Sequence, residues 1–275
     1  MSIKSNCYDL VKTVRIGLNE YSDALLQGTD TTGAYRNDDI LRKVNDAQKL
    51  FYSLVLGRDP QSFLTSTTLT GVASVYTPPS TFYRLYQLED QYGSKVHRID
   101  ANLHRRPQNT GDQNYYYWMG NTIVIDRVGF TDTLTLWYYT KIRELTYGKA
   151  SAGGVKSMTL NTDAKASADY YNNVTIENLT KGWVDTISDY SAARVATLAA
   201  ETAAANDWYG TISELHEDFH SLIADKALLL MKESILYQGQ PSKTDYDQYN
   251  DKLNNVLLSV FGTVNTDTPV QELFY

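Results

Sequence analysis

Two histidines flank a glutamate in the last quarter of the chain, in the order used by zinc hydrolases. His216 and His220 are four residues apart and Glu217 directly follows the first, so the run HEDFH matches the HExxH pattern. On a helix this spacing places both imidazoles on one face, where they can bind Zn²⁺ while the glutamate acts as a general base. These residues define one candidate chemistry, that of a zinc metallopeptidase.

The same segment also has a purely structural explanation. A catalytic zinc needs a third protein ligand, and the candidates Asp225 and Glu233 lie closer in sequence than zincin spacings suggest. Thr211 and Glu214 predict a capping box at the start of the helix. The helix then carries an apolar stripe that core packing explains, consisting of Leu215, Phe219, Leu222, Ile223, Leu230 and Met231. We therefore interpret both histidines as helix-surface or interface residues and predict no catalytic residue, no metal and no cofactor, with the metallopeptidase as the alternative.

Hydrophobic periodicity predicts helices near both ends of the chain and strands between them. Apolar residues at spacings of three and four indicate helices over 8–21, from Asn37 or Asp38 to about 57, from Thr211 to about Tyr237, and from about Ser242 to Phe261. Between them, β-branched and aromatic runs predict strands over 67–76, 81–88, 115–119, 122–126 and 133–140, with a hairpin turn at Gly120.

Residues 151–209 differ in composition from the rest of the chain. They are rich in Ala, Thr, Asn and Asp, and short alternating runs over 156–160, 174–178, 183–188 and 194–199 predict a small β-module. Its alanine-rich stretch ATLAAETAAAN fits either a strand or a helix, because periodicity does not separate the two there.

These elements predict an α+β fold in which the N- and C-terminal helices form a bundle and two β-units are inserted. The expected ranges are 1–150 for a helix hairpin plus antiparallel β-block, 151–209 for the inserted β-module, 210–262 for the helix pair that completes the bundle, and 263–275 for an extended arm.

Composition limits the classes of function. The net charge of −7 argues against a protein that grips DNA by neutralising phosphates. One cysteine excludes a disulfide framework, and no apolar run reaches the length of a membrane span or a signal sequence. The 22 tyrosines favour half-buried strands and protein–protein contacts.

The order of these segments resembles the head–tail adaptor, or connector, proteins of tailed bacteriophages. The resemblance covers about residues 5–145 and 211–260, including the helix FHSLIADKALLL. It rests on an acidic helix start, an "LN-x-AQ" type stretch, an "RD" exit and an aromatic "W-G-N-x-I" hairpin. The matching residues are Asp38, Val44, Asn45, Ala47, Gln48, Arg58, Asp59, Trp118, Gly120, Asn121 and Ile123.

The 151–209 block has a resemblance of its own. The run YYNNVTIENLTKGWVDTISDYSAARVATLA is similar to a small β-repeat of phage virion proteins, with Asn173 where that repeat usually has glycine. A different first turn is therefore expected there.

The resemblance implies a structural virion protein at the neck, made in the host cytoplasm. Such adaptors form a ring of about twelve subunits that docks on the portal protein, extends the DNA channel and offers a platform to the tail or nozzle protein. Genomic DNA would pass through without specific binding, and no membrane would be involved. The terminal residues Leu273, Phe274 and Tyr275 would suit portal binding. The alternative within this class is another neck or tail completion protein.

Overall fold

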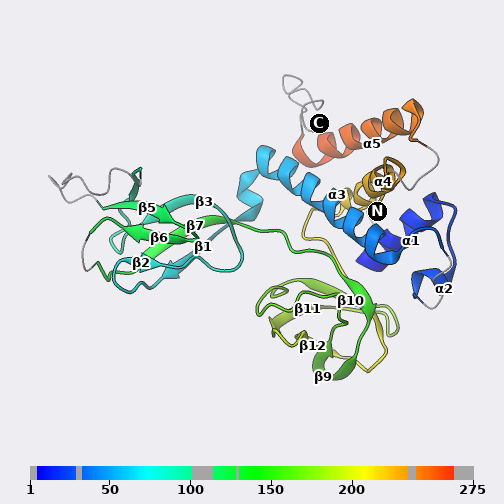
Figure 1. The fold of residues 1–275 in the computed structure, drawn as a ribbon, viewed down its shortest axis with the longest axis horizontal. Helices are drawn as coiled ribbons and strands as arrows, with labels where there is room; N and C mark the ends of the chain where they lie inside the picture. The colour runs from blue at the N-terminus through cyan, green and yellow to red at the C-terminus, as the bar shows by residue number, and fades with distance from the viewer. Residues whose placement is uncertain (1–4, 29–32, 101–113, 128–129, 235–239, 263–275) are drawn as a thin grey trace. The chain divides into compact units, whose positions relative to one another are not determined.

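The computed structural model describes residues 5–28, 33–100, 114–127, 130–234 and 240–262, which form a mixed α+β protein (Figure 1). These residues contain five α-helices and three β-sheets. The α+β class predicted from the sequence is confirmed, and the β content is larger than predicted. Within the described ranges no helix is both long and apolar enough to span a membrane. The chain divides into two compact units, one of residues 1–58 and 142–275 and one of residues 59–141.

The first unit contains all five α-helices, and polar side chains cap several of their starts. The helices are α1 (Cys7–Gly17), α2 (Asp23–Leu26), α3 (Asn37–Arg58), α4 (Asp218–Lys232) and α5 (Lys243–Phe261). The side chains of Asn6, Ser22 and Ser242 accept the free N–H groups at the starts of α1, α2 and α5. Asp245 completes a capping box with Ser242. These caps explain why the helices begin where they do.

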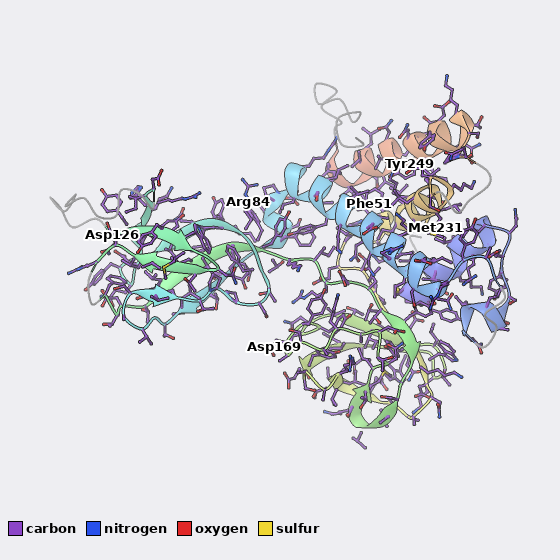
Figure 2. All side chains as sticks on the ribbon, in the orientation of Figure 1. Phe51, Arg84, Asp126, Asp169, Met231 and Tyr249 are labelled. Carbon is purple, nitrogen blue, oxygen red and sulfur yellow. The ribbon has the colours of Figure 1, made fainter. Side chains whose placement is uncertain are left out.

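Helix α4 is covered by helices from both ends of the chain. It contacts α1, α3 and α5, and its buried face includes Phe219, which is fully buried. The ring of Phe219 lies 5.7 Å from that of Phe51 on α3 and 6.4 Å from that of Phe261 on α5, and Figure 2 shows Phe51 on α3 beside α4. Burial of such aromatic rings supplies much of the hydrophobic stabilisation of this helical layer.

The first unit also holds a six-stranded antiparallel sheet with its own core. Its strands are β8 (Tyr147–Lys149), β9 (Ala152–Thr159), β10 (Thr175–Asn178), β11 (Trp183–Tyr190), β12 (Val195–Thr202) and β13 (Trp208–Thr211), in the order β8-β13-β10-β11-β12-β9. The alanine-rich stretch is strand, not helix, because Ala196 and Leu198 are buried while Thr197 and Ala199 are exposed, a period of two.

The sheet is wider than the predicted module of residues 151–209. It begins with β8 and ends with β13, so it takes in Tyr147 and Thr211 at its limits. Strands of three or four residues are too short to show an alternating pattern, so periodicity does not mark β8 and β13 as parts of the module. Asn173 has a φ of 65°, so it adopts the left-handed conformation that glycine would adopt at this turn, which asparagine tolerates.

The second unit consists of two small sheets around one core. After η1 (Pro60–Phe63), the strands β1 (Leu64–Leu69), β7 (Leu134–Thr140) and β3 (Phe82–Glu89) form one sheet in that order. The other sheet has the order β2 (Val75–Tyr76), β6 (Thr122–Ile125), β5 (Tyr115–Met119) and β4 (His97–Arg98). The predicted hairpin of β5 and β6 is present, and Gly120 in its turn has a φ of 60°.

One predicted strand is wrong. The run 67–76 divides between β1 and β2, which belong to different sheets. Gly71 lies against the ring of Tyr76, where a Cβ would come within 2.4 Å, and Ala73 and Ser74 both have positive φ. The backbone therefore turns between the two strands. The unit boundaries, after Arg58 and after Lys141, also differ from the predicted boundary at residue 150, because the β-block has a core separate from that of the helices.

The chain that returns from the second unit is fixed to α3 by buried polar side chains. Asn45 donates from Nδ2 to the carbonyl of Leu145 at 3.1 Å, and its Oδ1 accepts the Leu145 N–H at 2.6 Å. Gln48 donates to the carbonyl of Arg143 at 2.8 Å, and Lys49 pairs with Glu144 at 2.9 Å. These contacts supply hydrogen-bond partners to a buried segment that lies outside any sheet at this point.

Replacing Asn45 with alanine should lower the free energy of unfolding by about 2–3 kcal/mol, because both backbone groups of Leu145 would stay buried without a partner. Urea denaturation of the wild type and variant measures this difference. The matched control is Asn254→Ala on the exposed face of α5, which should change stability by no more than about 0.5 kcal/mol. Equal effects of the two substitutions would contradict the assigned role of Asn45.

Candidate functional site

The structure places the HEDFH motif across the start of α4, with His216 and Glu217 before the helix and His220 in its first turn. The predicted capping box at Thr211 and Glu214 is wrong, since α4 begins at Asp218. Thr211 ends strand β13, where its hydroxyl accepts the N–H of Thr146 at 2.8 Å. The carboxylate of Glu214 pairs with the Arg143 guanidinium and accepts the Arg143 N–H. Both predicted capping side chains are used by tertiary partners.

The two histidines of the motif have different surroundings. The side chain of His216 is 56% exposed, and its Nδ1 lies 3.4 Å from the Asp218 carboxylate. His220 is 1% exposed. Its Nδ1 accepts the backbone N–H of Ser5 and its Nε2 lies 3.1 Å from the carbonyl of Leu215, so the ring is held in the Nε2–H form. His220 thus attaches the N-terminal segment to the start of α4.

The remaining candidate ligands are engaged elsewhere. The Asp225 carboxylate binds Lys252 at 2.7 Å, and Glu233 accepts the Tyr246 hydroxyl at 2.7 Å. In the part of the chain that the structure describes, no three His, Cys, Asp or Glu side chains converge to hold a metal ion. With one histidine outside the helix and the other using both nitrogens, the described residues do not assemble a zinc site at this motif.

His220→Ala should lower the free energy of unfolding by about 2–4 kcal/mol, because it leaves a cavity and two backbone groups without partners. His216→Ala is the matched control and should stay within about 0.5 kcal/mol of the wild type. Chemical denaturation measures both. Stoichiometric zinc in the purified protein that is lost in both variants would contradict this assignment and restore the metallopeptidase alternative.

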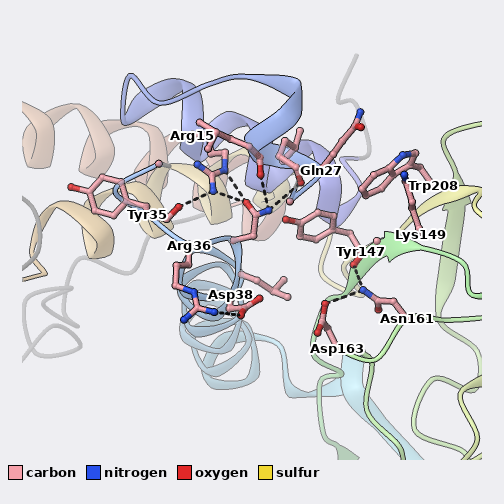
Figure 3. Close-up of a pocket in the computed structure, with 17 residues that line it drawn as sticks. Arg15, Gln27, Tyr35, Arg36, Asp38, Tyr147, Lys149, Asn161, Asp163 and Trp208 are labelled. Carbon is pink, nitrogen blue, oxygen red and sulfur yellow. Dashed lines mark hydrogen bonds and ion pairs between the residues drawn. The ribbon is translucent and has the colours of Figure 1, made fainter. Parts of the chain in front are cut away.

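A cavity of about 570 Å³ is the other candidate site, and it lies within the first unit (Figure 3). One wall is formed by the end of α2 with Gln27 and Gly28, by Gly33, and by residues 35–38 at the start of α3. The other is formed by β8, β13 and the turn after β9, including Tyr147, Trp208 and Asn161. The volume is within the range of about 300–1,000 Å³ that is typical of ligand sites.

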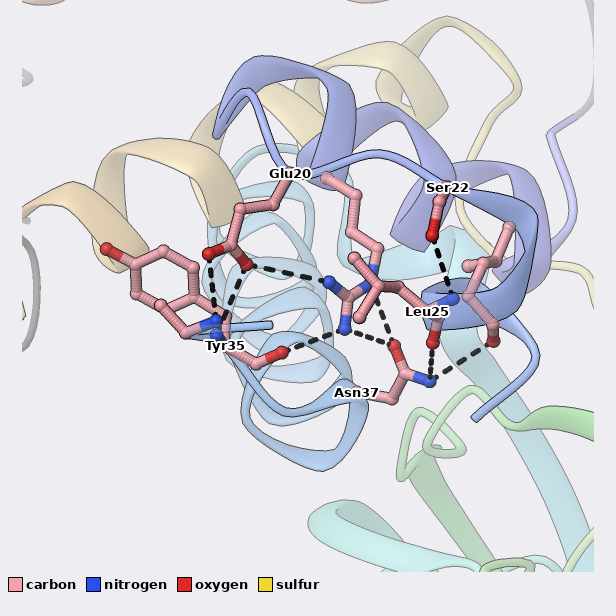
Figure 4. Close-up of polar contacts among 8 residues, drawn as sticks. Glu20, Ser22, Leu25, Tyr35 and Asn37 are labelled. Carbon is pink, nitrogen blue, oxygen red and sulfur yellow. Dashed lines mark hydrogen bonds and ion pairs between the residues drawn. The ribbon is translucent and has the colours of Figure 1, made fainter. Parts of the chain in front are cut away.

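A buried arginine holds the first wall in place (Figure 4). Arg15 is 1% exposed; its Nε and Nη2 donate to Asn37 Oδ1 at 2.9 and 2.6 Å, and Nη2 also donates to the carbonyl of Tyr35. Glu20 lies 3.8 Å from Nη1 and accepts the N–H groups of Ala34 and Tyr35. Burial lowers the pKa of Arg15, but an arginine so far above neutrality stays charged.

The amide of Asn37 extends this network to α2. Its Nδ2 donates to the carbonyls of Leu25 and Leu26 at 2.9 and 3.1 Å. These are carbonyls at the end of the four-residue helix α2, which has few intrahelical partners. One arginine and one asparagine therefore fix the shape of the wall.

The second wall is held by Asn161. Its Oδ1 accepts the Tyr209 hydroxyl at 2.7 Å, and its Nδ2 donates to the carbonyl of Tyr147 at 3.2 Å and to Asp163 at 2.9 Å. Gly148 lies so close to Asn161 that a Cβ would come within 2.3 Å of it. The residue at position 148 must therefore be glycine for the turn to pack against β8.

Charges of both signs line the cavity. Arg36 and Asp38 form a loose pair at 3.9 Å in which the arginine side chain is 81% exposed. Lys149 lies over the ring of Trp208, with 5.2 Å between its Nζ and the ring centroid. Burial, and then the charge of Asp38, raise the pKa of Asp163. The lining therefore offers cations, carboxylates and an aromatic ring together.

Asp163→Asn should stabilise the protein at neutral pH, because it removes a negative charge that burial and Asp38 disfavour. The gain should be no more than about 1 kcal/mol, because solvent screens the charge of this partly exposed carboxylate. A raised pKa means that the folded state keeps the proton longer, so wild-type stability should fall as pH rises from about 4, and the gain from Asp163→Asn should disappear at lower pH. Urea denaturation between pH 4 and 7 tests this, with Asp251→Asn on the exposed face of α5 as control. A gain that is the same at every pH would contradict the electrostatic cause.

The residues that carry the family resemblance lie in several places. Asn45 and Gln48 fix the returning chain, and Asp38 lines the cavity. Trp118 packs against Phe82 in the second unit, with 5.6 Å between ring centroids. The proposed portal-binding residues Leu273, Phe274 and Tyr275 lie outside the described residues.

Sequence reasoning missed the cavity. Its walls come from positions as distant as Arg15 and Trp208, which no local motif connects. One signal was present: Arg15 lies between Val11 and Leu18 in the apolar stripe of the first helix, and a charged residue in such a stripe is buried only with partners.

No model of a known protein family matches the chain, and no curated protein matches its sequence. The functional argument therefore depends on the motifs and the geometry described above.

Proposed function

We propose that this protein is a head–tail adaptor of a tailed bacteriophage, a non-enzymatic ring subunit that docks on the portal, extends the DNA channel and provides the platform for the tail. One observation carries the proposal. The two segments that resemble the adaptor family, about 5–145 and 211–260, are separated in sequence, yet α4 packs against α1 and α3 within one unit. Helices α1, α3, α4 and α5 would be the helical bundle of the adaptor.

The polar residues of the resemblance support the same proposal. Asn45 and Gln48 belong to the "LN-x-AQ" type stretch, and both are buried against the segment that follows the β-block. Their hydrogen bonds link α3 to the chain that follows the inserted strands. An insertion between the helices needs such a link, so the same contacts explain both the polar residues of the motif and the order of the elements.

Exposed aromatic and apolar side chains on the second unit are suited to protein contacts. Tyr86 and Met119 are more than half exposed and Tyr92 is 82% exposed. Large side chains with an apolar body are enriched at interfaces, where their burial contributes much of the affinity. These side chains would meet neighbouring subunits or the tail partner.

The charge of the chain is consistent with a DNA conduit. A net charge of −7 gives little attraction to phosphates, so DNA could pass without being retained. In this proposal Leu273, Phe274 and Tyr275 bind the portal protein.

Quantitative peptide mass spectrometry on purified particles tests this function. We expect about twelve copies of the chain per particle, the number of subunits in a ring matched to a portal, counted against the major capsid protein. A chain that is absent from particles, or present at a stoichiometry unrelated to the portal, would overturn the proposal.

A further inference from the structure

The hydroxyl of Tyr147 borders the cavity without a hydrogen-bond partner. Tyr147 is 7% exposed and lines the cavity, and Figure 3 shows its ring directed between the two walls. Within the described ranges this hydroxyl forms no hydrogen bond. A buried hydroxyl that the protein leaves unpaired needs a partner from outside the chain. The cavity is the place where such a partner can bind.

A second donor of the cavity lining is also unsatisfied. The Nη1 atom of Arg15 is buried without a hydrogen-bond acceptor, since the Glu20 carboxylate is 3.8 Å away. Burial is the largest cause of the raised pKa of Tyr147, and the charge of Arg15 opposes that shift, so the two side chains lie near each other. A hydroxyl beside a buried guanidinium is suited to an oxygen acceptor with a negative charge, such as a carboxylate.

Two carboxylates line the cavity from its opposite walls. Asp38 belongs to the start of α3 and Asp163 to the turn after β9. Burial, and then the charge of Asp38, raise the pKa of Asp163, while the charge of Arg194 offsets part of this effect. In the part of the chain that the structure describes, Asp163 forms no ion pair and Asp38 forms only the loose pair with Arg36. A positive group between the two carboxylates would relieve their repulsion.

We propose that the cavity binds a small zwitterion with an apolar body, of the class of a free aromatic amino acid or a dipeptide. The carboxylate of this ligand accepts from the Tyr147 hydroxyl beside the buried charge of Arg15. Its ammonium group lies between Asp38 and Asp163. This site goes beyond the adaptor function and does not depend on it.

The rest of the lining favours a zwitterion over an ion of one sign. Arg36 and Lys149 line the cavity together with the two carboxylates, so a pure cation or a pure anion meets like charges there. Leu25, Leu26 and Leu41 also line it and offer apolar surface to a hydrocarbon body. The volume of about 570 Å³ leaves room for a molecule of dipeptide size.

Calorimetric titration of the full-length protein with three matched probes tests the site. The probes are leucyl-phenylalanine, which is a zwitterion at neutral pH, its C-terminal amide, which is a cation, and its N-acetyl form, which is an anion. The zwitterion should bind as one molecule per chain and about tenfold more tightly than either derivative, because each derivative lacks one of the two charges that the lining recognises.

Two substitutions test the two ends of the ligand separately. Tyr147→Phe removes only the hydroxyl and should weaken binding of the dipeptide about fivefold or more. Its matched control is Tyr249→Phe, at a similarly buried tyrosine of α5 that lies outside the cavity lining. Asp163→Asn should weaken the dipeptide about three- to tenfold without weakening the N-acetyl form, which has no ammonium group. Asp251→Asn is the control for this charge.

Three results would overturn the site: no saturable binding of the dipeptide, equal affinities of the three probes, or binding that neither substitution weakens. Circular dichroism verifies that the variants are folded, and the comparison of the three probes on the wild type is decisive without them. Particle stoichiometry reports on the adaptor function independently, so about twelve copies per particle without dipeptide binding would reject the ligand site alone.

Discussion

The first unit depends on how the chain is held when it returns from the inserted β-block. A helix has already paired most of its own backbone groups, so α3 can hold a neighbouring buried segment only through side chains. Asn45 supplies both a donor and an acceptor to Leu145, and Gln48 supplies a donor to Arg143. Because these bonds are shielded from water, losing one partner costs the desolvation of the other.

The segment fixed in this way connects the helices to the sheet. Arg143 extends from it to Glu214 and to the carbonyl of Asn172, and Thr146 pairs with Thr211 at the end of β13. Strand β8 follows directly, so its position beside β13 is a consequence of where α3 holds residues 143–145. The cavity lies next to this strand, with its opposite wall set by Arg15.

In several places of the first unit, polar side chains hold neighbouring backbone segments in position. His220 joins Ser5 to Leu215, Asn37 completes α2, and Asn161 holds the turn at β8. A histidine that uses both nitrogens on backbone groups has none left for a metal or a proton transfer. The HEDFH run therefore illustrates why a motif needs its structural context before it indicates chemistry.

The sequence by itself determined the elements whose information is local. Side-chain periodicity predicted α1, α3 and α5, and turn and alternation patterns predicted the Gly120 hairpin and the main strands of the module, because the interactions that favour these elements lie within a few residues. The start of α4 could not be predicted in this way, since Thr211 and Glu214 bond to Thr146 and Arg143 instead of capping a helix. The cavity was decided by tertiary structure alone, because its walls come from residues as distant in sequence as Arg15 and Trp208, which only folding brings together.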